Sequence, residues 1–154
     1  MIPMTATRAL DLTHFPLVVV VIPAKLDPSY AELLEADHKV LFAKRARYVS
    51  ISDSTRVVGM PDAKTRQRMG VWAKSHEDDL KRWQLANAIV VGSSLVRAAL
   101  SAVHWFAPPP VPTRIETDVA TALAFLRAEA EKAKLTTVGI DEYARLLRLP
   151  PVAS

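Results

Sequence analysis

Residues 95–117 constrain the fold of this chain more than any other segment. The pattern from Leu95 to Phe106 is that of a helix with apolar residues at almost every position, and a proline-rich run at 108–112 ends it. A helix of this kind has to be covered on nearly every face, as happens in a layered α/β domain or at an interface. The prolines stiffen the return of the chain to a short strand at 114–116. The segment therefore indicates a fold class, and not an activity.

Other segments predict the rest of a sheet. Residues 17–22 are six consecutive aliphatic residues, which is typical of a central strand covered on both faces. Residues 47–53 alternate, which places Val49 and Ile51 on one face. Two further strand patterns lie at 8–13 and 85–91.

A first helix is expected from Pro28 to Leu41. Asp27 or Ser29 can cap its free amide groups, and proline suits the first helical position. We expect its buried face to consist of Tyr30, Leu33, Leu34, Val40 and Leu41. Asp37 interrupts this stripe, and we expect it at an edge, reaching solvent.

The next helix is predicted to begin at residues 61–62 and to continue as far as Trp83. Its apolar positions are spaced by three and four residues, which keeps one face turned to the core. They are Met69, Trp72, His76, Leu80 and Trp83.

A later helix should begin after Thr117 and Asp118 and end near Lys134. Residues 135–139 have the pattern of a linker, and residues 140–149 that of a short amphipathic helix. With 154 residues, the chain fits one domain of ordinary size. We therefore predict an α/β domain over 1–134 and a linker with a short helical tail over 135–154. Helices between successive strands imply mostly parallel pairing.

Composition excludes several functions. Cysteine is absent, so disulfides, thiolate metal sites and cysteine nucleophiles are excluded. The net charge of +4 is a modest excess, and aromatic residues do not interleave with the basic clusters, so nucleic-acid binding is not expected. The longest apolar run, residues 15–24, is too short to span a membrane, and residues 11–14 do not suit a signal peptide. We expect a cytoplasmic protein without a membrane span.

The element order and three short strings resemble STAS-like domains, which are related to the sporulation anti-sigma-factor antagonist. The strings are Phe15 to Val18, Arg47-Tyr48 and Ala107 to Arg114, and the resemblance spans roughly residues 8 to 133. It implies a four- or five-stranded mixed, mostly parallel sheet with helices packed mainly on one side. It also implies a regulatory or protein-binding module without enzymatic turnover.

In the sigma-factor antagonists, a serine in the loop after the third strand is phosphorylated. Asp53, Ser54 and Thr55 occupy that region here, but the glycine that should follow is absent and the loop runs on to Gly59. The resemblance makes Ser54 and Thr55 candidate phosphoacceptors. Arg56 and the amides of the following helix could hold the phosphate. The alternative is an ordinary capped loop.

Other chemical candidates are better explained by structure. Residues 92–94, Gly-Ser-Ser, lack the second glycine of a nucleophile elbow and suit a helix cap. Residues 76–79, His-Glu-Asp-Asp, are neighbours on a helix and do not converge on one metal ion. His38 and His104 are expected to be structural, and the prolines at 109–112 a connector.

The sequence thus predicts a non-enzymatic module that binds another protein, with no cofactor and no metal. A small-ligand or lipid-binding module of the same fold is the alternative, and an enzyme the third reading. Apolar residues that cannot all face one sheet at 95–106 also suggest self-association. The expected partner contacts are Arg56, Trp105, Phe106, Ile140, Tyr143, Leu146 and Leu147.

Overall fold

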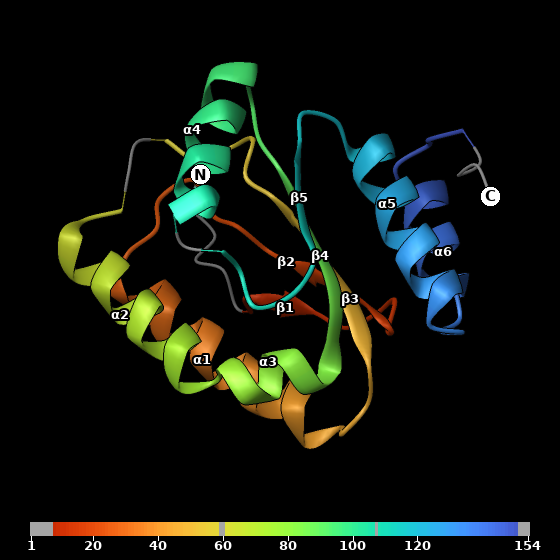
Figure 1. Cartoon of the computed structure of the whole chain (residues 1–154), viewed down its shortest axis with the longest axis horizontal. Coiled ribbons are helices and arrows are strands. Elements are labelled where there is room, and N and C mark those ends of the chain that lie inside the picture. Colours follow the sequence, from red (N-terminus) through yellow and green to blue (C-terminus); the bar gives the residue numbers. More distant parts are fainter. Residues whose placement is uncertain (1–7, 59–60, 107, 151–154) are drawn as a thin grey trace, which may run out of the picture.

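A five-stranded sheet forms the centre of the protein (Figure 1). The computed structural model describes residues 8–58, 61–106 and 108–150. The strands lie side by side in chain order, with β1 antiparallel to β2 and every later pair parallel. Their bounds are β1 Leu10–Asp11, β2 Leu17–Val20, β3 Tyr48–Asp53, β4 Gln84–Val90 and β5 Thr113–Glu116. The predicted mixed, mostly parallel sheet is confirmed.

Helices cover both faces of this sheet. Their bounds are α1 Pro28–Ala43, α2 Ala63–Ser75, α3 Glu77–Trp83, α4 Ser94–Phe106, α5 Val119–Lys132 and α6 Val138–Leu146. Figure 1 shows α5 and α6 on one side of the sheet and α1, α2 and α3 on the other. The α/β class is confirmed. Helices were expected mainly on one side of the sheet, and α5 and α6 form a second layer on the other side.

The side of the sheet under α5 is closely packed. Leu17, Val49 and Ile51 project to this side and share one buried cluster with Leu123 and Leu126 of α5. Small residues of β4, among them Ala86 and Ala88, let the helix approach closely. On the other side, a smaller cluster joins Leu10, Val18, Leu41 and Tyr48.

Aspartate caps begin the helices where the sequence predicted them. The carboxylate of Asp27 accepts a hydrogen bond from the amide of Tyr30 at 3.0 Å. Asp118 accepts one from the amide of Thr121 at 2.8 Å. These contacts satisfy amide groups that have no partner within the helix. The predicted starts of α1 and α5 are therefore confirmed.

The single helix expected to reach Trp83 is instead two helices that meet at His76, and that prediction was wrong. The hydroxyl of Ser75 donates to the carbonyl of Val71, and Nδ1 of His76 donates to the carbonyl of Trp72 at 2.9 Å. Side chains that bond to the last carbonyls of a helix offer the backbone an alternative to continuing it. Three acidic residues at 77–79 then favour a new helix N-terminus.

Asp37 does not face solvent as expected. Its carboxylate accepts two backbone hydrogen bonds, from Ala9 at 2.6 Å and from Leu10 at 3.0 Å. Both of those residues are buried. Asp37 thus ties the N-terminal strand to α1. Val40, which was expected in the buried stripe of this helix, is exposed.

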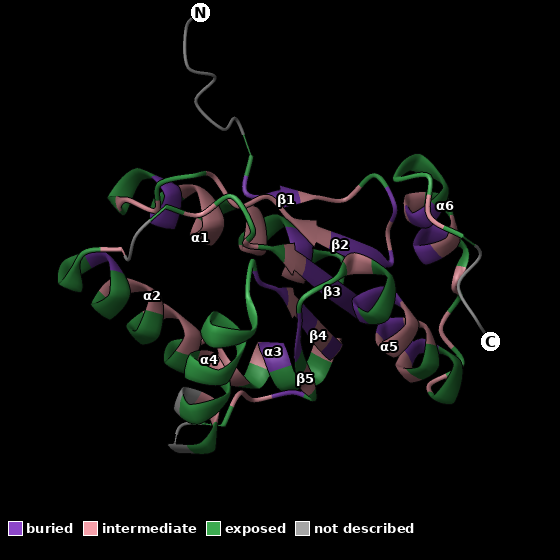
Figure 2. Cartoon of the chain, turned by 90° about the horizontal axis from the view of Figure 1, so that it is seen from above, coloured by how far each residue is buried: buried purple, intermediate pink, exposed green. Residues whose placement is uncertain are grey.

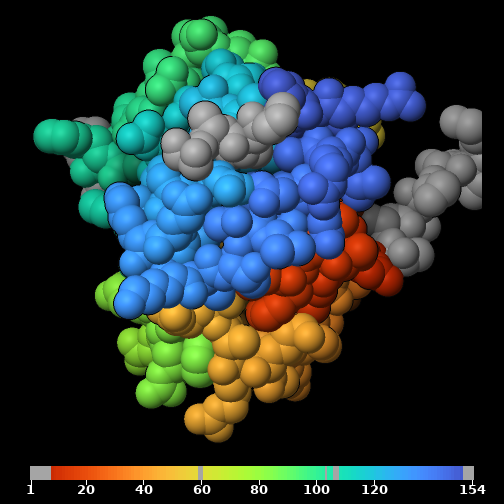
Figure 3. Space-filling model, turned by 90° about the vertical axis from the view of Figure 1, so that its right-hand side faces the viewer, coloured from red at the N-terminus to blue at the C-terminus, as the bar shows by residue number. Residues whose placement is uncertain are grey.

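The segment beyond residue 134 packs on the rest of the domain. Figure 3 shows α6 between α5 and the N-terminal segment of the chain. Ile140 and Ala144 belong to the main buried cluster. Asp141 pairs with Arg127 of α5, and Glu142 lies 3.4 Å from Nδ1 of His14. A methyl group at position 139 would collide with the carbonyl of His14, so glycine permits this close approach.

Candidate binding sites

A cavity lies between α1, α2 and the sheet. We call it the inner cavity, and its volume is about 230 Å³. Its walls are mostly aliphatic, with Val18, Leu34 and Met69 among them. It exists because β3 alternates: the larger side chains of Val49 and Ile51 point to α5, and the small serines at 50 and 52 point to α1.

Polar side chains from two strands line the floor of the inner cavity. Gln84 donates to the hydroxyl of Ser50 at 2.6 Å, and Ser50 donates to the amide oxygen of Asn87 at 2.9 Å. Ser52 lines the same floor. A ligand in this space would therefore meet apolar walls and a hydrogen-bonding base, which is the usual composition of a small-molecule site.

Tyr48 contributes a buried hydroxyl that has no hydrogen-bond partner among the described residues. Its ring lines the inner cavity and packs with Leu41. Burial raises the pKa of this hydroxyl, and the carboxylate of Asp79 raises it further. The group therefore stays protonated and able to donate.

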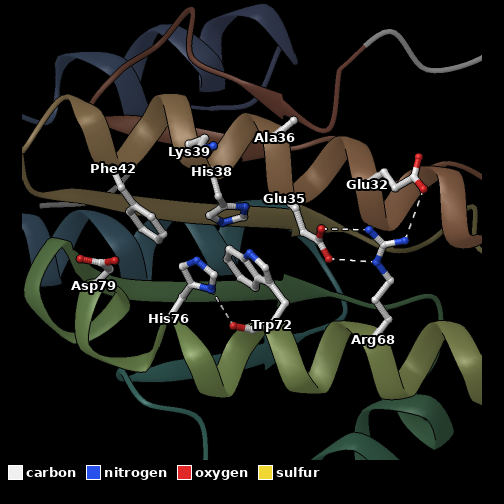
Figure 4. A pocket seen from close by; sticks show the side chains of 10 residues that line it. All are labelled: Glu32, Glu35, Ala36, His38, Lys39, Phe42, Arg68, Trp72, His76 and Asp79. Carbon is white, nitrogen blue, oxygen red and sulfur yellow. Dashed lines mark hydrogen bonds and ion pairs between the residues drawn. The ribbon is translucent and has the colours of Figure 1, made fainter.

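A second hollow, which we call the outer cleft, opens between α1 and α2 and has a volume of about 550 Å³ (Figure 4). Four rings meet in it. The Trp72 ring lies 4.5 Å from the His38 ring and 4.7 Å from the His76 ring, measured between centroids. Phe42 is almost parallel to Trp72, at 6.4 Å. His38 lines both the outer cleft and the inner cavity.

Both histidines of the outer cleft hold a defined tautomer. Nδ1 of His38 lies 2.9 Å from the carbonyl of Leu34, and Nδ1 of His76 lies 2.9 Å from the carbonyl of Trp72. A carbonyl can only accept, so each Nδ1 carries the proton and each Nε2 is left to accept when the ring is neutral. Burial lowers the pKa of His38, which favours the neutral ring.

An ion pair closes one end of the outer cleft. Arg68 donates from Nε and from one terminal nitrogen to the two oxygens of Glu35, each at 3.0 Å. Its other terminal nitrogen lies 3.4 Å from Glu32. The hydrogen bonds to Arg68 lower the pKa of Glu35, so the pair stays ionised.

The structure changes the roles expected for Trp72 and His76. Both were assigned to a core stripe, but they are half-buried and line the outer cleft. Trp83 does pack against a buried cluster. The cleft was missed because its residues come from two helices whose packing the periodicity does not encode. The aromatic and histidine spacing at 38, 42, 72 and 76 is the signal that could have indicated it.

The candidate phosphoacceptors lie at the end of β3. Thr55 is exposed, and its amide and hydroxyl both donate to Asp53, at 3.0 and 2.6 Å. The amide of Ser54 bonds to the carbonyl of Val90. Arg56 is exposed in the same loop. The helix amides expected to hold a phosphate are not adjacent, because α2 begins only at residue 63.

Ser93 acts as the expected cap, since its hydroxyl accepts from the amide of Val96 at 3.2 Å. Ser93 precedes α4, which was expected to be covered either by the domain or at an interface. The described part of the chain does not cover it, and Figure 2 shows it exposed along most of its length. Leu95 and Trp105 are 82% and 83% exposed. The side chain of Phe106 lies outside the described part of the structure. An apolar helix in water is the kind of surface that a partner covers.

The contacts expected at the C-terminal helix divide into two groups. Ile140 is buried and cannot contact a partner, which corrects that prediction. Tyr143 is half-buried, 5.8 Å from the ring of His14. Leu146 and Leu147 are exposed.

Within the described ranges, no group of three or more histidine or acidic side chains is placed to hold a metal ion. No helix in those ranges is long and apolar enough to cross a membrane.

Comparison with known proteins supports the fold. The structure is similar to the crystal structure of an uncharacterized protein of the DUF3478 family from Shewanella loihica PV-4, which is described as having a SpoIIAA-like fold. The TM-score is 0.56 and the identity 19%, over 71% of this chain and 82% of that one. No protein-family model and no curated protein matches the chain. The predicted STAS-like fold is confirmed, and the likeness extends to the fold alone.

Proposed function

We propose that this protein is a non-enzymatic regulatory module that binds another protein through α4. The single observation that carries the proposal is the exposure of α4. Arg97, the one Asp, Glu, Lys or Arg residue of the helix, lies 3.8 Å from Glu116. Apart from Ser94 and Ser101, the other exposed side chains described in this helix are apolar. Such a surface has a free-energy cost in water that a protein partner with an apolar face removes.

Site-specific photo-crosslinking in the native host tests this proposal. A photoreactive amino acid replaces Leu95 or Trp105 in α4, and Val71, an exposed apolar residue of α2, serves as the matched control. We expect one protein to be cross-linked from both α4 positions and not from position 71. The same product should disappear when Ala99, also exposed, is changed to Glu. A product with twice the mass of the chain would identify the partner as a second copy.

Identical products from all three positions, or none from α4, would contradict binding through this helix. The variant Ala99→Glu should keep its melting temperature, because an exposed position contributes little to folding. Loss of the product is then attributable to the surface and not to unfolding.

The inner cavity favours a second candidate function, the binding of a small apolar ligand. Its volume of about 230 Å³ is below the usual range of about 300 to 1,000 Å³ for small-molecule sites, so it has room for a very small ligand or for one arm of a larger one. The polar floor formed by Ser50, Asn87 and Gln84 would orient the ligand.

A filling substitution tests this second candidate. Leu34→Trp would place a larger side chain in the inner cavity, and Leu33→Trp, at a neighbouring half-buried position outside its lining, is the control. Native mass spectrometry of the purified protein should detect a retained small molecule in the wild type and in Leu33→Trp. Retention of the same molecule by Leu34→Trp would contradict the assignment.

A further inference from the structure

Aromatic rings that also pack on one another line a space of ligand size in the outer cleft. In Figure 4, His38 and Phe42 reach from α1 toward Trp72 and His76, which come from α2 and from its junction with α3. His38 is tilted by 55° to Trp72, so the two rings form a corner. The volume of about 550 Å³ is within the range of small-molecule sites.

Negative charge is in excess along the outer cleft. Its lining contains three carboxylates, from Glu32, Glu35 and Asp79, and two permanent cations, Arg68 and Lys39. Arg68 is held by both glutamates at one end. Asp79 lies at the other end, on the side of Phe42 and His76 (Figure 4). The aromatic rings therefore lie between a compensated ion pair and a carboxylate.

We propose that the outer cleft binds a small organic cation that carries a methylated ammonium group. The negative faces of the Trp72 and Phe42 rings attract a cation, and methyl groups reduce the hydration that an ammonium would otherwise lose. Asp79 supplies the opposite charge. Burial lowers the pKa of His38 and favours its neutral ring, which adds no repulsion, and the bond from its Nδ1 to the carbonyl of Leu34 leaves Nε2 as an acceptor for a hydroxyl on the ligand.

The arrangement argues against an anion as the ligand. Arg68 could have held one, but its guanidinium already makes a two-bond contact with Glu35. The positive charge of Lys39 in the lining repels a cationic ligand, so removing this charge tests whether the ligand is a cation. The outer cleft is separate from the surface of α4, and its proposed ligand is a free small molecule. Cation binding in the cleft and partner binding through α4 are therefore tested independently.

Choline and 3,3-dimethylbutan-1-ol form a matched pair of probes, because they have the same shape and only choline is charged. Titration of the whole protein is followed by ligand-observed NMR. Choline should bind more tightly than the neutral alcohol by about twofold to thirtyfold, the range of cation–π attraction. The methyl signals of bound choline should also shift upfield, because ring currents act on protons above a ring face.

Four variants locate the site. Trp72→Leu and Asp79→Asn should each weaken choline binding and leave binding of the neutral alcohol nearly unchanged. Lys39→Gln should tighten choline binding. Trp105→Leu removes an exposed tryptophan outside the cleft and should change neither affinity.

Equal affinity for choline and the neutral alcohol would overturn the proposal. So would equal choline affinities of Trp72→Leu and Trp105→Leu, or weaker binding by Lys39→Gln. If Trp72→Leu fails to fold, Asp79→Asn and Lys39→Gln still decide the matter, because their opposite effects depend on charge and not on packing.

Discussion

Replacement of Ile140 by alanine should destabilise the protein, because the C-terminal helix is part of its core. The side chain of Ile140 is 1% exposed and belongs to the cluster that contains Leu17, Leu126 and Ala130. α5 and the sheet hold the residues around Ile140 in place, so the cavity left by the smaller alanine side chain cannot collapse. A substitution of this kind costs about 2 to 5 kcal/mol of unfolding free energy.

Leu146→Ala is the matched control, since Leu146 lies in the same helix and is 69% exposed. Its effect should be within about 0.5 kcal/mol. Urea unfolding of both variants measures the difference, and for a chain of this size each kcal/mol corresponds to roughly 2 to 4 °C in melting temperature. Truncation after Lys134 should lower stability at least as much as Ile140→Ala.

Equal unfolding midpoints for Ile140→Ala and Leu146→Ala would show that α6 is not part of the core. A truncation that leaves the melting temperature unchanged would show the same, because this is the behaviour of a detached docking segment. Gly139→Ala gives an independent check of the same packing. The added methyl group meets the carbonyl of His14, so this variant should be destabilised although it loses no buried surface.

Two further predictions concern α1. Asp37→Ala leaves the buried amides of Ala9 and Leu10 without an acceptor and should lower the free energy of unfolding by about 2 to 4 kcal/mol, with Asp37→Asn intermediate. The control, Glu32→Ala, removes an exposed ion pair on the same helix and should cost less than about 1 kcal/mol. Equal urea midpoints for Asp37→Ala and Glu32→Ala would exclude this role of Asp37. Burial lowers the pKa of His38 below its ordinary value of 6.5. Between these two pKa values the unfolded chain binds a proton that the folded chain excludes. The contribution of His38 to the free energy of unfolding is therefore complete above pH 6.5 and is lost as the pH falls through the lower folded pKa. Unfolding midpoints measured on both sides of pH 6.5 should show that loss, and a His38→Gln variant with the same pH dependence would contradict it.

Most of the secondary structure could be predicted because its signals are local. The aliphatic run at 17–22 predicted a strand, which forms over Leu17–Val20 and is fully buried only at its first two residues. The aspartates at 27 and 118 predicted helix starts, because each caps an amide three residues further along the chain. The break at His76 also has a local cause. The acidic residues at 77–79 are a signature of a helix N-terminus as well as possible metal ligands.

The candidate sites could not be predicted in the same way, because they depend on how elements pack. Periodicity placed Trp72 and His76 on one helical face, and it could not say that this face meets α1 at a cleft and not in a close contact. The apolar character of residues 95–106 was also evident. Whether such a helix is buried by its own chain or by a partner depends on tertiary packing, and α4 remains largely exposed to solvent.

The alternation of β3 explains why the inner cavity and the main buried cluster lie on opposite sides of the sheet. Val49 and Ile51 fill the space under α5 with aliphatic volume, and this side also receives Ile140 from α6. On the other side, Ser50 and Ser52 leave space that α1 does not fill, and hydrogen bonds to Asn87 and Gln84 stabilise the polar floor. A residue pattern with period two thus produces a close-packed side that maintains the fold and a hollow side with room for a ligand. The smaller cluster of Leu10, Val18, Leu41 and Tyr48 packs beside the inner cavity, so substitutions that leave this cluster intact are the ones expected to alter the cavity without unfolding the protein.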